Sequence, residues 1–348
     1  MLVTKNKVQI KEIAERLGLS PGTVSIVLNG RGDKMRISKE TQKRVKEVAQ
    51  EMDYQPNIYA RRLRKSGSEA ASRVIAVLWN SGYDDEIMGS FFRGLQNLVK
   101  ESGEHVEFYV QMFAYGMLSE CERIMTPERF SGIIISGISD ADSEFLNSRS
   151  FDVPIVCAFR NEKQYHCVYI NDYGIGANAA SLFAQRGHKT AGLIGSNQKG
   201  PNSVLREMGF VDKCGELGMT VKEEWVREEA GRDYHSGYIA MDEVLKCKSR
   251  PTAMFVNVPD QAIGATVACR NNGLKFKEDI ELLAVGSKKA FEYFSPAIST
   301  VGISTELIAK NTLELLFLAG NKENAKTMSR VLDAEYTFGD TCGGFGTN

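Results

Sequence analysis

Long apolar runs are absent from this sequence of 348 residues. No run approaches the roughly 20 residues that a membrane-spanning helix needs. The first residues, MLVTKNKVQIKE, lack the apolar centre of a secretory signal peptide. We therefore expect a cytoplasmic protein with no membrane partner.

Cysteine and histidine are scarce, and neither shows the spacing of a metal site. The 7 cysteines form no CxxC pair and mostly lie inside apolar runs, which is typical of buried free thiols. The 4 histidines are scattered along the chain without ligand spacing. These patterns predict neither disulfides nor a bound metal.

Charge is distributed unevenly along a chain whose net charge is only -1. Residues 1–66 hold 15 basic and 7 acidic residues, a net charge of +8, which leaves -9 for residues 67–348. A basic segment of this kind predicts a polyanionic partner such as nucleic acid. Residues 65–72 are small and polar with no periodic apolar face, so we interpret them as a linker to an acidic body.

Beyond this linker, short and nearly continuous apolar runs alternate with amphipathic stretches. Such runs indicate strands buried on both faces, and helices between them indicate parallel sheets joined by right-handed crossovers. The runs are too numerous for one sheet, so we predict an α/β body of two similar lobes with a ligand cleft at the carboxyl ends of the strands. The expected strands are 73–79, 106–113, 132–136, 153–159, 167–170, 190–195, 252–258, 280–286 and 298–303.

The basic segment has the spacing of a helix-turn-helix. Apolar residues over 10–17 predict a first helix, and Gly18 suits the left-handed position that ends it. Ser20 as N-cap and Pro21 as first residue predict a second helix, and a third is expected after Ser38. The second helix would present its first turn to a DNA major groove. The alternative is a three-helix bundle packed on the body.

Two stretches of this segment, IKEIAERLGLSPGTVSIVLNG and ISKETQKRVKEVAQEMDYQPNIYARRLR, resemble the DNA-binding region of lactose-repressor (LacI/GalR) family regulators over about residues 9–65. The body continues the resemblance, in the order that the family shows, through PIVCAF, YINDYGIGANAA, RGHKTAGLIG, LREMGF, SGYIAM, PTAMFV, AIGA and STVGIS. The resemblance implies a homodimeric transcription regulator, most often a repressor, with a periplasmic-binding-protein-like body. That body binds a small sugar or sugar derivative and thereby alters affinity for double-stranded operator DNA, without any cofactor.

The resemblance also implies a hinge within YQPNIYARRLRKSGS. A hinge helix of about two turns is too short to be stable alone, so its folding is expected to depend on DNA and on a partner hinge. Leu63 matches the family's minor-groove wedge, although an ordinary packing leucine is the alternative. The expected DNA-contacting residues are Ser20, Pro21, Gly22, Thr23, Ser25, Ile26, Asn29, Arg31, Lys34, Arg36, Asn57, Ala60, Arg61 and Leu63.

On the second helix the sequence departs from the family pattern. The family's base-reading positions fall on Pro21, Gly22 and Ile26, and none of these side chains can form a bidentate hydrogen bond to a base. We therefore hypothesise that the operator is read by contact of Ile26 with thymine methyl groups, by DNA shape and by the loop 30–36. That loop is about three residues longer than in common members of the family.

Arg206 matches the family's effector-contacting arginine, whose planar guanidinium suits paired hydroxyls, carboxylate or phosphate. Phe159 and Lys288 replace two acidic residues that bind sugar hydroxyls in many members, which disfavours a neutral sugar held by carboxylates. An anion such as a sugar phosphate or sugar acid is one open alternative, and solvated surface cations are the other. The expected effector-binding residues are Trp79, Ser81, Tyr83, Phe159, Arg160, Arg206, Arg232, Tyr234, Asp260 and Lys288.

A sugar-processing or dinucleotide-dependent α/β enzyme is the competing function. YGIGANA satisfies G-x-G-x-x-A behind an apolar run, but no acidic residue follows about 20 residues later to bind a ribose. GSNQKG lacks the Lys-Ser/Thr ending of a phosphate-binding loop, and no H-E-x-x-H occurs. An enzyme has no use for a basic helix-turn-helix and hinge, so we predict a regulator without catalytic residues.

The predicted organisation has three parts: a helix-turn-helix domain at 1–55, a hinge and linker at 56–72, and an effector-binding and dimerisation body at 73–348. Within the body, lobe 1 is expected at about 73–161 and 290–322, and lobe 2 at about 162–289 and 323–340. The expected place of action is the bacterial nucleoid.

Overall fold

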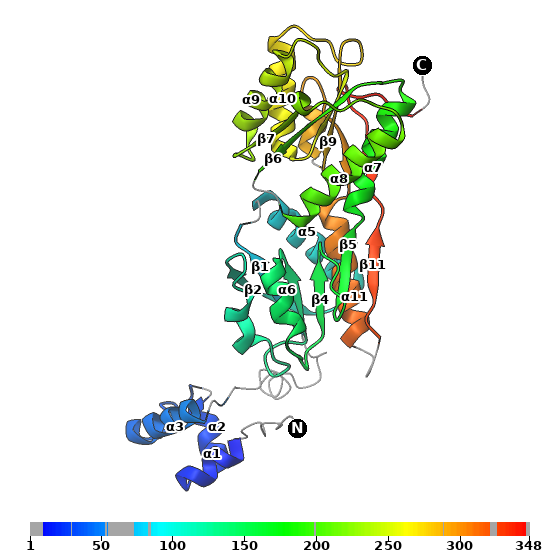
Figure 1. The fold of residues 1–348 in the computed structure, drawn as a ribbon. Coiled ribbons are helices and arrows are strands. Elements are labelled where there is room, and N and C mark those ends of the chain that lie inside the picture. The colour runs from blue at the N-terminus through cyan, green and yellow to red at the C-terminus, as the bar shows by residue number, and fades with distance from the viewer. Residues whose placement is uncertain are drawn as a thin grey trace.

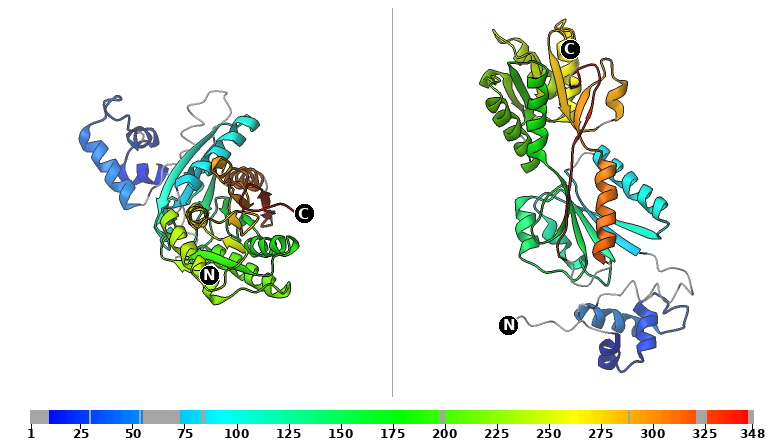
Figure 2. Two further views of the ribbon diagram at one scale, coloured as in Figure 1. Left: turned by 90° about the horizontal axis from the view of Figure 1, so that it is seen from above. Right: turned by 90° about the vertical axis from the view of Figure 1, so that its right-hand side faces the viewer.

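The computed structural model describes residues 10–28, 30–52, 54, 73–82, 85–197, 200–287, 289–320 and 326–345. These residues form a three-helix head and an α/β body with two sheets (Figures 1 and 2). The mixed class, the parallel sheets and the N-terminal helices are as predicted from the sequence. Among the residues described, no helix is long and apolar enough to cross a membrane.

The head contains three helices whose ends follow the predicted capping residues. Gly18 has a φ of +64° and ends the first helix. The Ser20 hydroxyl accepts a hydrogen bond from the Thr23 amide at 3.1 Å, and the Ser38 hydroxyl accepts one from the Thr41 amide at 3.2 Å. The helices are α1 (Ile10–Leu17), α2 (Pro21–Leu28) and α3 (Lys39–Glu51).

One small apolar core holds the three helices of the head together. Its fully buried members come from all three helices and are Ile13, Ala14, Val24, Val27, Val45 and Ala49. The core therefore uses the inner face of α2, which leaves the first turn of that helix exposed.

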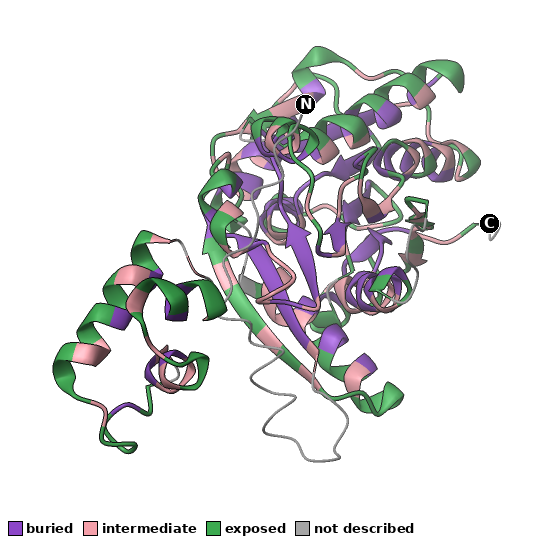
Figure 3. Ribbon diagram, turned by 90° about the horizontal axis from the view of Figure 1, so that it is seen from below, coloured by how far each residue is buried: buried purple, intermediate pink, exposed green. Residues whose placement is uncertain are grey.

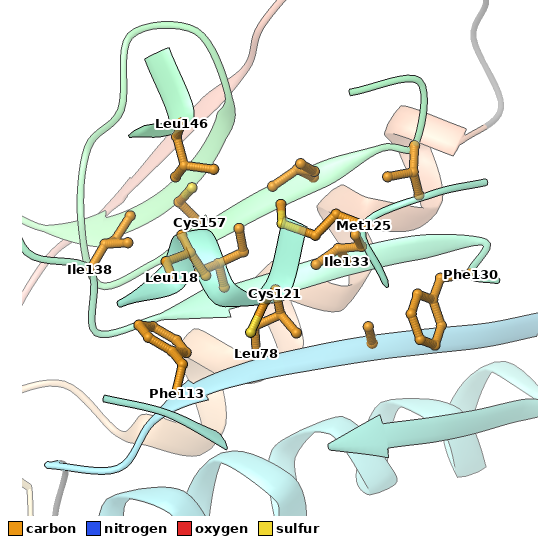
Figure 4. Packing of buried hydrophobic residues seen from close by; sticks show 14 of the residues in the cluster. Leu78, Phe113, Leu118, Cys121, Met125, Phe130, Ile133, Ile138, Leu146 and Cys157 are labelled. Carbon is orange, nitrogen blue, oxygen red and sulfur yellow. The ribbon is translucent and has the colours of Figure 1, made fainter. Parts of the chain in front are cut away.

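Lobe 1 is built on a six-stranded parallel sheet with the order β11-β5-β4-β3-β1-β2. Its strands are β1 (Arg73–Asn80), β2 (Val106–Phe113), β3 (Gly132–Ser136), β4 (Ile155–Ala158), β5 (His166–Ile170) and β11 (Ser329–Leu332). One face packs against α5 (Asp85–Ser102) and α11 (Thr305–Gly320). The other packs against the 3-10 helix η1 (Leu118–Ile124) and α6 (Asp140–Asn147), and Figure 4 shows part of that cluster.

Lobe 2 repeats this plan with the strand order β12-β10-β9-β8-β6-β7, in which only β12 is antiparallel to its neighbour. Its strands are β6 (Ala191–Ser196), β7 (Val226–Glu229), β8 (Ala253–Val256), β9 (Glu281–Val285), β10 (Ser299–Gly302) and β12 (Glu335–Thr337). One face packs against α7 (Asp172–Gln185) and α8 (Pro201–Glu216), the other against α9 (Tyr234–Leu245) and α10 (Pro259–Asn271). Two short 3-10 helices, η2 (Glu223–Trp225) and η3 (Lys289–Tyr293), complete the lobe.

The predicted lobe boundaries were wrong in three places. Strand β5 pairs with β4, so residues 162–170 belong to lobe 1, and β11 pairs with β5 in the same sheet. Strand β10 pairs with β9, which places residues 290–302 in lobe 2. An apolar run identifies a strand but does not say which sheet it joins, because pairing depends on residues far apart in the sequence.

Strand β2 also differs from the prediction of a strand buried on both faces. It is an edge strand with β1 as its neighbour, and Tyr109, Val110 and Met112 on it are exposed. The central strands, in contrast, are buried (Figure 3). All 7 cysteines are free, and six of them are buried, which confirms the prediction of buried free thiols.

Candidate functional site

The exposed first turn of α2 is the candidate DNA-contacting surface of the head. Ser20, Pro21 and Gly22 are exposed, and Thr23 is half-buried. The hydroxyl oxygens of Ser20 and Thr23 lie 2.9 Å apart, and both therefore lie at the entrance of the helix. Because the first backbone N–H groups of a helix have no partner within it, this end favours a negatively charged partner.

Further along the same helix, Ser25 and Ile26 are half-buried. Seven predicted site residues lie outside the described residues, so the structure does not test them. They are Asn29, Asn57, Ala60, Arg61, Leu63, Tyr83 and Lys288.

In the body, Arg206 of α8 is the centre of a buried polar network. Its Nη1 donates to Oδ1 of Asp172 at 2.5 Å, its Nε to Oδ1 of Asn257 at 2.7 Å and its Nη2 to the hydroxyl of Ser203 at 3.1 Å. These partners come from the first turn of α7, the end of β8 and the first turn of α8. These three hydrogen bonds hold the guanidinium in one orientation.

Two glycines explain why these partners meet. Gly176 of α7 and Gly209 of α8 lie where the two helices touch backbone to backbone. A methyl group on Gly209 would overlap the carbonyl oxygen of Tyr173, and one on Gly176 would overlap that of Arg206. This close approach brings the first turn of α7, with Asp172, against the side chain of Arg206.

The network compensates the charge of the arginine. Asp172 is only 6% exposed; burial raises its pKa, and the adjacent guanidinium of Arg206 opposes that rise. Asn257 extends the network, since its Nδ2 donates to the Ser203 carbonyl oxygen at 3.0 Å and to Oε1 of Glu207 at 2.9 Å. Asp172, Ser203 and Asn257 were not predicted as site residues. Their signal was position alone, because each is a polar residue near the carboxyl end of a strand or the start of a helix.

In lobe 1, Phe159 follows β4 in an unusual backbone conformation. Its φ is +67°, which is strained for an aromatic residue, and its carbonyl oxygen accepts a hydrogen bond of 2.9 Å from Nδ2 of Asn202 on α8. This bond joins lobe 1 to lobe 2. The Phe159 ring centroid lies 6.4 Å from that of Trp79 and 5.8 Å from that of Phe91.

Trp79, expected to line the cleft, is fully buried in the core of lobe 1. The apolar strand β1 continues to its carboxyl end beneath α5, and for this reason the indole packs inward. Of the two roles that suit an aromatic ring here, a wall for a ligand or a core residue, the structure shows Trp79 in the second.

Arg160, which was expected to attract an anion, forms ion pairs with two carboxylates of lobe 1. Its Nη2 lies 2.7 Å from Oδ1 of Asp140 and its Nε 2.8 Å from Oε1 of Glu162. Although burial lowers the pKa of Arg160, contacts with these two carboxylates raise it overall. Arg160 and Arg206 are thus each bound to carboxylates of the protein itself.

The remaining predicted effector residues lie at the ends of secondary-structure elements. Ser81 follows β1 and is exposed, Arg232 and Tyr234 are exposed at the start of α9, and Asp260 lies half-buried in the first turn of α10. Beside Asp260, Gln261 is fully buried and donates to the carbonyl oxygens of Gly195 and Gly231, both at 3.0 Å. Its Oε1 has no hydrogen-bond partner among the described residues, so it is a candidate ligand contact that the sequence analysis missed.

Both the head and the body of the chain are similar to known proteins. A model of bacterial regulatory proteins of the lacI family matches residues 9–57, and a model of periplasmic binding protein-like domains matches residues 180–342. The HTH-type transcriptional regulator AglR of Rhizobium meliloti (strain 1021) is 30% identical over 283 residues, 80% of this chain and 77% of that protein. The probable HTH-type transcriptional repressor ExuR of Bacillus subtilis (strain 168) is 27% identical over 305 residues, 87% of this chain and 88% of that protein.

The body is similar to a solved structure as well. A LacI family transcription regulator from Clostridium acetobutylicum superposes with a TM-score of 0.71 and 26% sequence identity, covering 77% of this chain and 99% of that chain. The similarity therefore extends from the sequence motifs to the two-sheet architecture.

Proposed function

Because the chain belongs to the lacI family of bacterial regulatory proteins, we propose that it represses transcription by binding double-stranded operator DNA, under the control of a small effector. The observation that carries this proposal is the head, in which the apolar face of α2 is buried and its first turn is exposed. That arrangement suits insertion of α2 into a major groove. As a DNA-binding regulator, the protein acts in the cytoplasm at the nucleoid.

The effector is a small polyhydroxylated molecule, a sugar or sugar derivative, bound between the lobes. Arg206 supports this assignment because its guanidinium is held rigidly by Asp172 and Asn257. Carboxylates already compensate Arg206 and Arg160, which favours a neutral ligand over the anion that the sequence departures favoured. Gln261 contributes an unused acceptor, as a ligand hydroxyl requires.

Binding is coupled to DNA through the relative position of the lobes. The hydrogen bond from Asn202 to the Phe159 carbonyl crosses between them, so a ligand that opens the cleft breaks this bond and one that closes the cleft keeps it. In a homodimer, a change in lobe position alters the separation of the two heads. Exposed apolar residues on β2 and at η3, namely Tyr109, Val110, Met112, Tyr293 and Phe294, support a dimer surface that includes both lobes.

The test of DNA binding is selection of randomised duplex DNA by the full-length protein. We expect a roughly palindromic consensus with two half-sites, one for each head. Failure of the full-length protein to enrich any sequence at low salt would contradict the proposal.

The test of the effector is a thermal-shift screen of the full-length protein against paired neutral sugars, sugar phosphates and sugar acids. A ligand that binds only the folded state raises the melting temperature. We expect stabilisation by a neutral sugar that is lost in Arg206→Lys, which keeps the charge but not the planar fork. Stabilisation by the sugar phosphates or sugar acids alone would contradict the neutral effector and favour an anionic one.

A further inference from the structure

The α2–α3 loop, residues 30–37, carries three cations that the head does not neutralise. Arg31, Lys34 and Arg36 are exposed, and their side chains form no ion pair with another described residue. Asp33, the one acidic residue of the loop, is bound by Lys39 with an Nζ–Oδ2 distance of 2.8 Å. The loop therefore presents three uncompensated positive charges to solvent.

Backbone hydrogen bonds give this loop a defined shape. They run from the amides of three residues late in the loop to the carbonyl oxygens of three residues early in it. The bonds are Met35 to Arg31 at 3.0 Å, Arg36 to Asp33 at 3.1 Å and Ile37 to Gly32 at 2.9 Å. These contacts hold Arg36 at a φ of +53°, a conformation that a non-glycine residue rarely adopts without support.

Side-chain contacts anchor the loop to α3. Asp33 accepts from Nζ of Lys39 and from Nε2 of Gln42, each at 2.8 Å, and these hydrogen bonds lower the pKa of Asp33. Gln42 also donates to the carbonyl oxygen of Ile37 at 2.8 Å, and the buried Gly32 lies against the Gln42 side chain. A cation on an anchored loop loses less freedom on binding than one on a free chain.

The position of the loop relative to α2 points to its partner. The Arg31 amide donates to the carbonyl oxygen of Ile26 at 3.0 Å, so the loop continues directly from the last turn of the helix. The eight residues of α2 make it about 12 Å long, which is about the width of a major groove. When the first turn of α2 enters the groove, the loop cations come within reach of the phosphates that border it.

The side chains of helix α2 carry no charge. Its sequence, PGTVSIVL, contains no charged residue, and Pro21, Gly22 and Ile26 cannot donate paired hydrogen bonds to a base. In protein–DNA complexes the phosphate contacts supply much of the affinity and set the position of the protein on the duplex. In this chain the cationic side chains for such contacts have to come from elements outside α2.

We propose that the α2–α3 loop is a preformed phosphate clamp, which fixes α2 in the major groove by binding the DNA backbone through Arg31, Lys34 and Arg36. The inference rests on the proposed function, because the partner is the operator. The clamp supplies affinity and position. It differs from the hypothesis drawn from the sequence, in which this loop helps to read the operator, because the clamp carries no base preference of its own.

The first test compares the loop variant Arg31→Gln/Lys34→Gln with a control variant, Lys43→Gln/Arg44→Gln, which removes two exposed cations from α3. Affinity for the selected operator is measured from 50 to 300 mM salt. The loop variant is expected to lower the slope of log Kd against log salt by about 3.6, since each of the two heads of the dimer loses two phosphate contacts and each lost contact removes about 0.9. The selected consensus should stay the same.

The control variant is expected to keep the wild-type salt slope. Equal slopes in wild type and loop variant, or equal losses in loop and control variants, overturn the clamp. A changed consensus in the loop variant overturns it as well, because it would mean that the loop reads bases.

The second test separates a positioned clamp from general attraction of charge. Asp33→Ala removes a negative charge, so net charge alone predicts tighter binding to DNA. The clamp predicts weaker binding, by at least about threefold, because the cations lose their anchor. Gln42→Ala removes the other anchor without a change in charge and is expected to weaken binding in the same direction.

Affinity in both anchor variants equal to or above that of wild type would overturn the inference. Circular dichroism at 222 nm establishes that each variant keeps its helices. If the wild-type protein selects no operator, the proposed function fails. If it selects one and all the loop variants bind like wild type, only the clamp fails.

Discussion

Arg206→Met removes one side of the buried pair that lies at the centre of the candidate cleft. Asp172 is 6% exposed, and its carboxylate receives a hydrogen bond from the guanidinium at 2.5 Å. Methionine keeps most of the side-chain volume, so the substitution removes charge and hydrogen bonds without a large cavity. The variant leaves Asp172 as a buried carboxylate without its cation.

The expected cost is large because burial is nearly complete. Removing one partner of a buried ion pair typically destabilises a protein by about 3–5 kcal/mol. In domains of roughly this size, 1 kcal/mol corresponds to about 2–4 °C in melting temperature. We therefore expect the body to melt roughly 10 °C lower at pH 7, measured by calorimetry of the full-length protein.

The loss should depend on pH. Burial raises the pKa of Asp172 in the wild type, and Arg206 opposes this effect, so removing the arginine raises the pKa further. An acid whose folded-state pKa exceeds its unfolded-state value, near 4, contributes stability that is lost as pH rises between those two values. The difference in stability between wild type and Arg206→Met is therefore expected to be smaller at pH 5 than at pH 7.

A second substitution tests the cause. Asp172→Asn removes the buried charge, so the double variant Asp172→Asn/Arg206→Met is expected to be more stable than Arg206→Met alone by at least about 1 kcal/mol. A cost below 1 kcal/mol for Arg206→Met, or no recovery in the double variant, would refute the account of a buried, mutually dependent pair.

Three further perturbations are expected to act through single, identifiable contacts. Gly209→Ala places a methyl group against the Tyr173 carbonyl and should destabilise the body by about 1–3 kcal/mol, whereas Gly215→Ala, which meets no atom within 4 Å, should be neutral or stabilising in the same thermal assay. Burial alone would raise the pKa of Glu281, but hydrogen bonds from His188 and Arg186 lower it to about 2. The stability that this carboxylate contributes is therefore present above about pH 4.5 and is lost as the pH falls towards 2. Urea denaturation of Glu281→Gln and wild type should therefore differ more at pH 7 than at pH 3. Ser38→Ala removes the cap of α3 and should cost about 1 kcal/mol, seen as faster amide exchange in its first turn.

Helices and strands were predictable because their signals are local. The left-handed Gly18, the cap formed by Ser20 and the apolar spacing of 10–17 lie within a few residues of the features that they specify. The central strands were found for a similar reason, since strands buried on both faces require continuous apolar runs.

Strand neighbours were not predictable, because they depend on contacts distant in the sequence. The runs of β2 and β4 look alike, yet β2 lies at the edge of its sheet with exposed residues and β4 lies inside. For the same reason β5, β10 and β11 were assigned to the wrong lobe, because the sheet that each joins depends on its pairing partner.

The residues around Arg206 show most clearly which features could be predicted from the sequence and which could not. Residue type and spacing were enough to predict the α/β class and the helix-turn-helix head, and the family resemblance pointed to Arg206. That Asp172 compensates this arginine and that Asn202 reaches Phe159 in the other lobe became visible only in the folded chain. Asp172 and Arg206 are 34 positions apart in the sequence, and the close contact between α7 and α8 brings them together. Electrostatic compensation depends on the distance between the two charges in space, and the sequence does not state that distance.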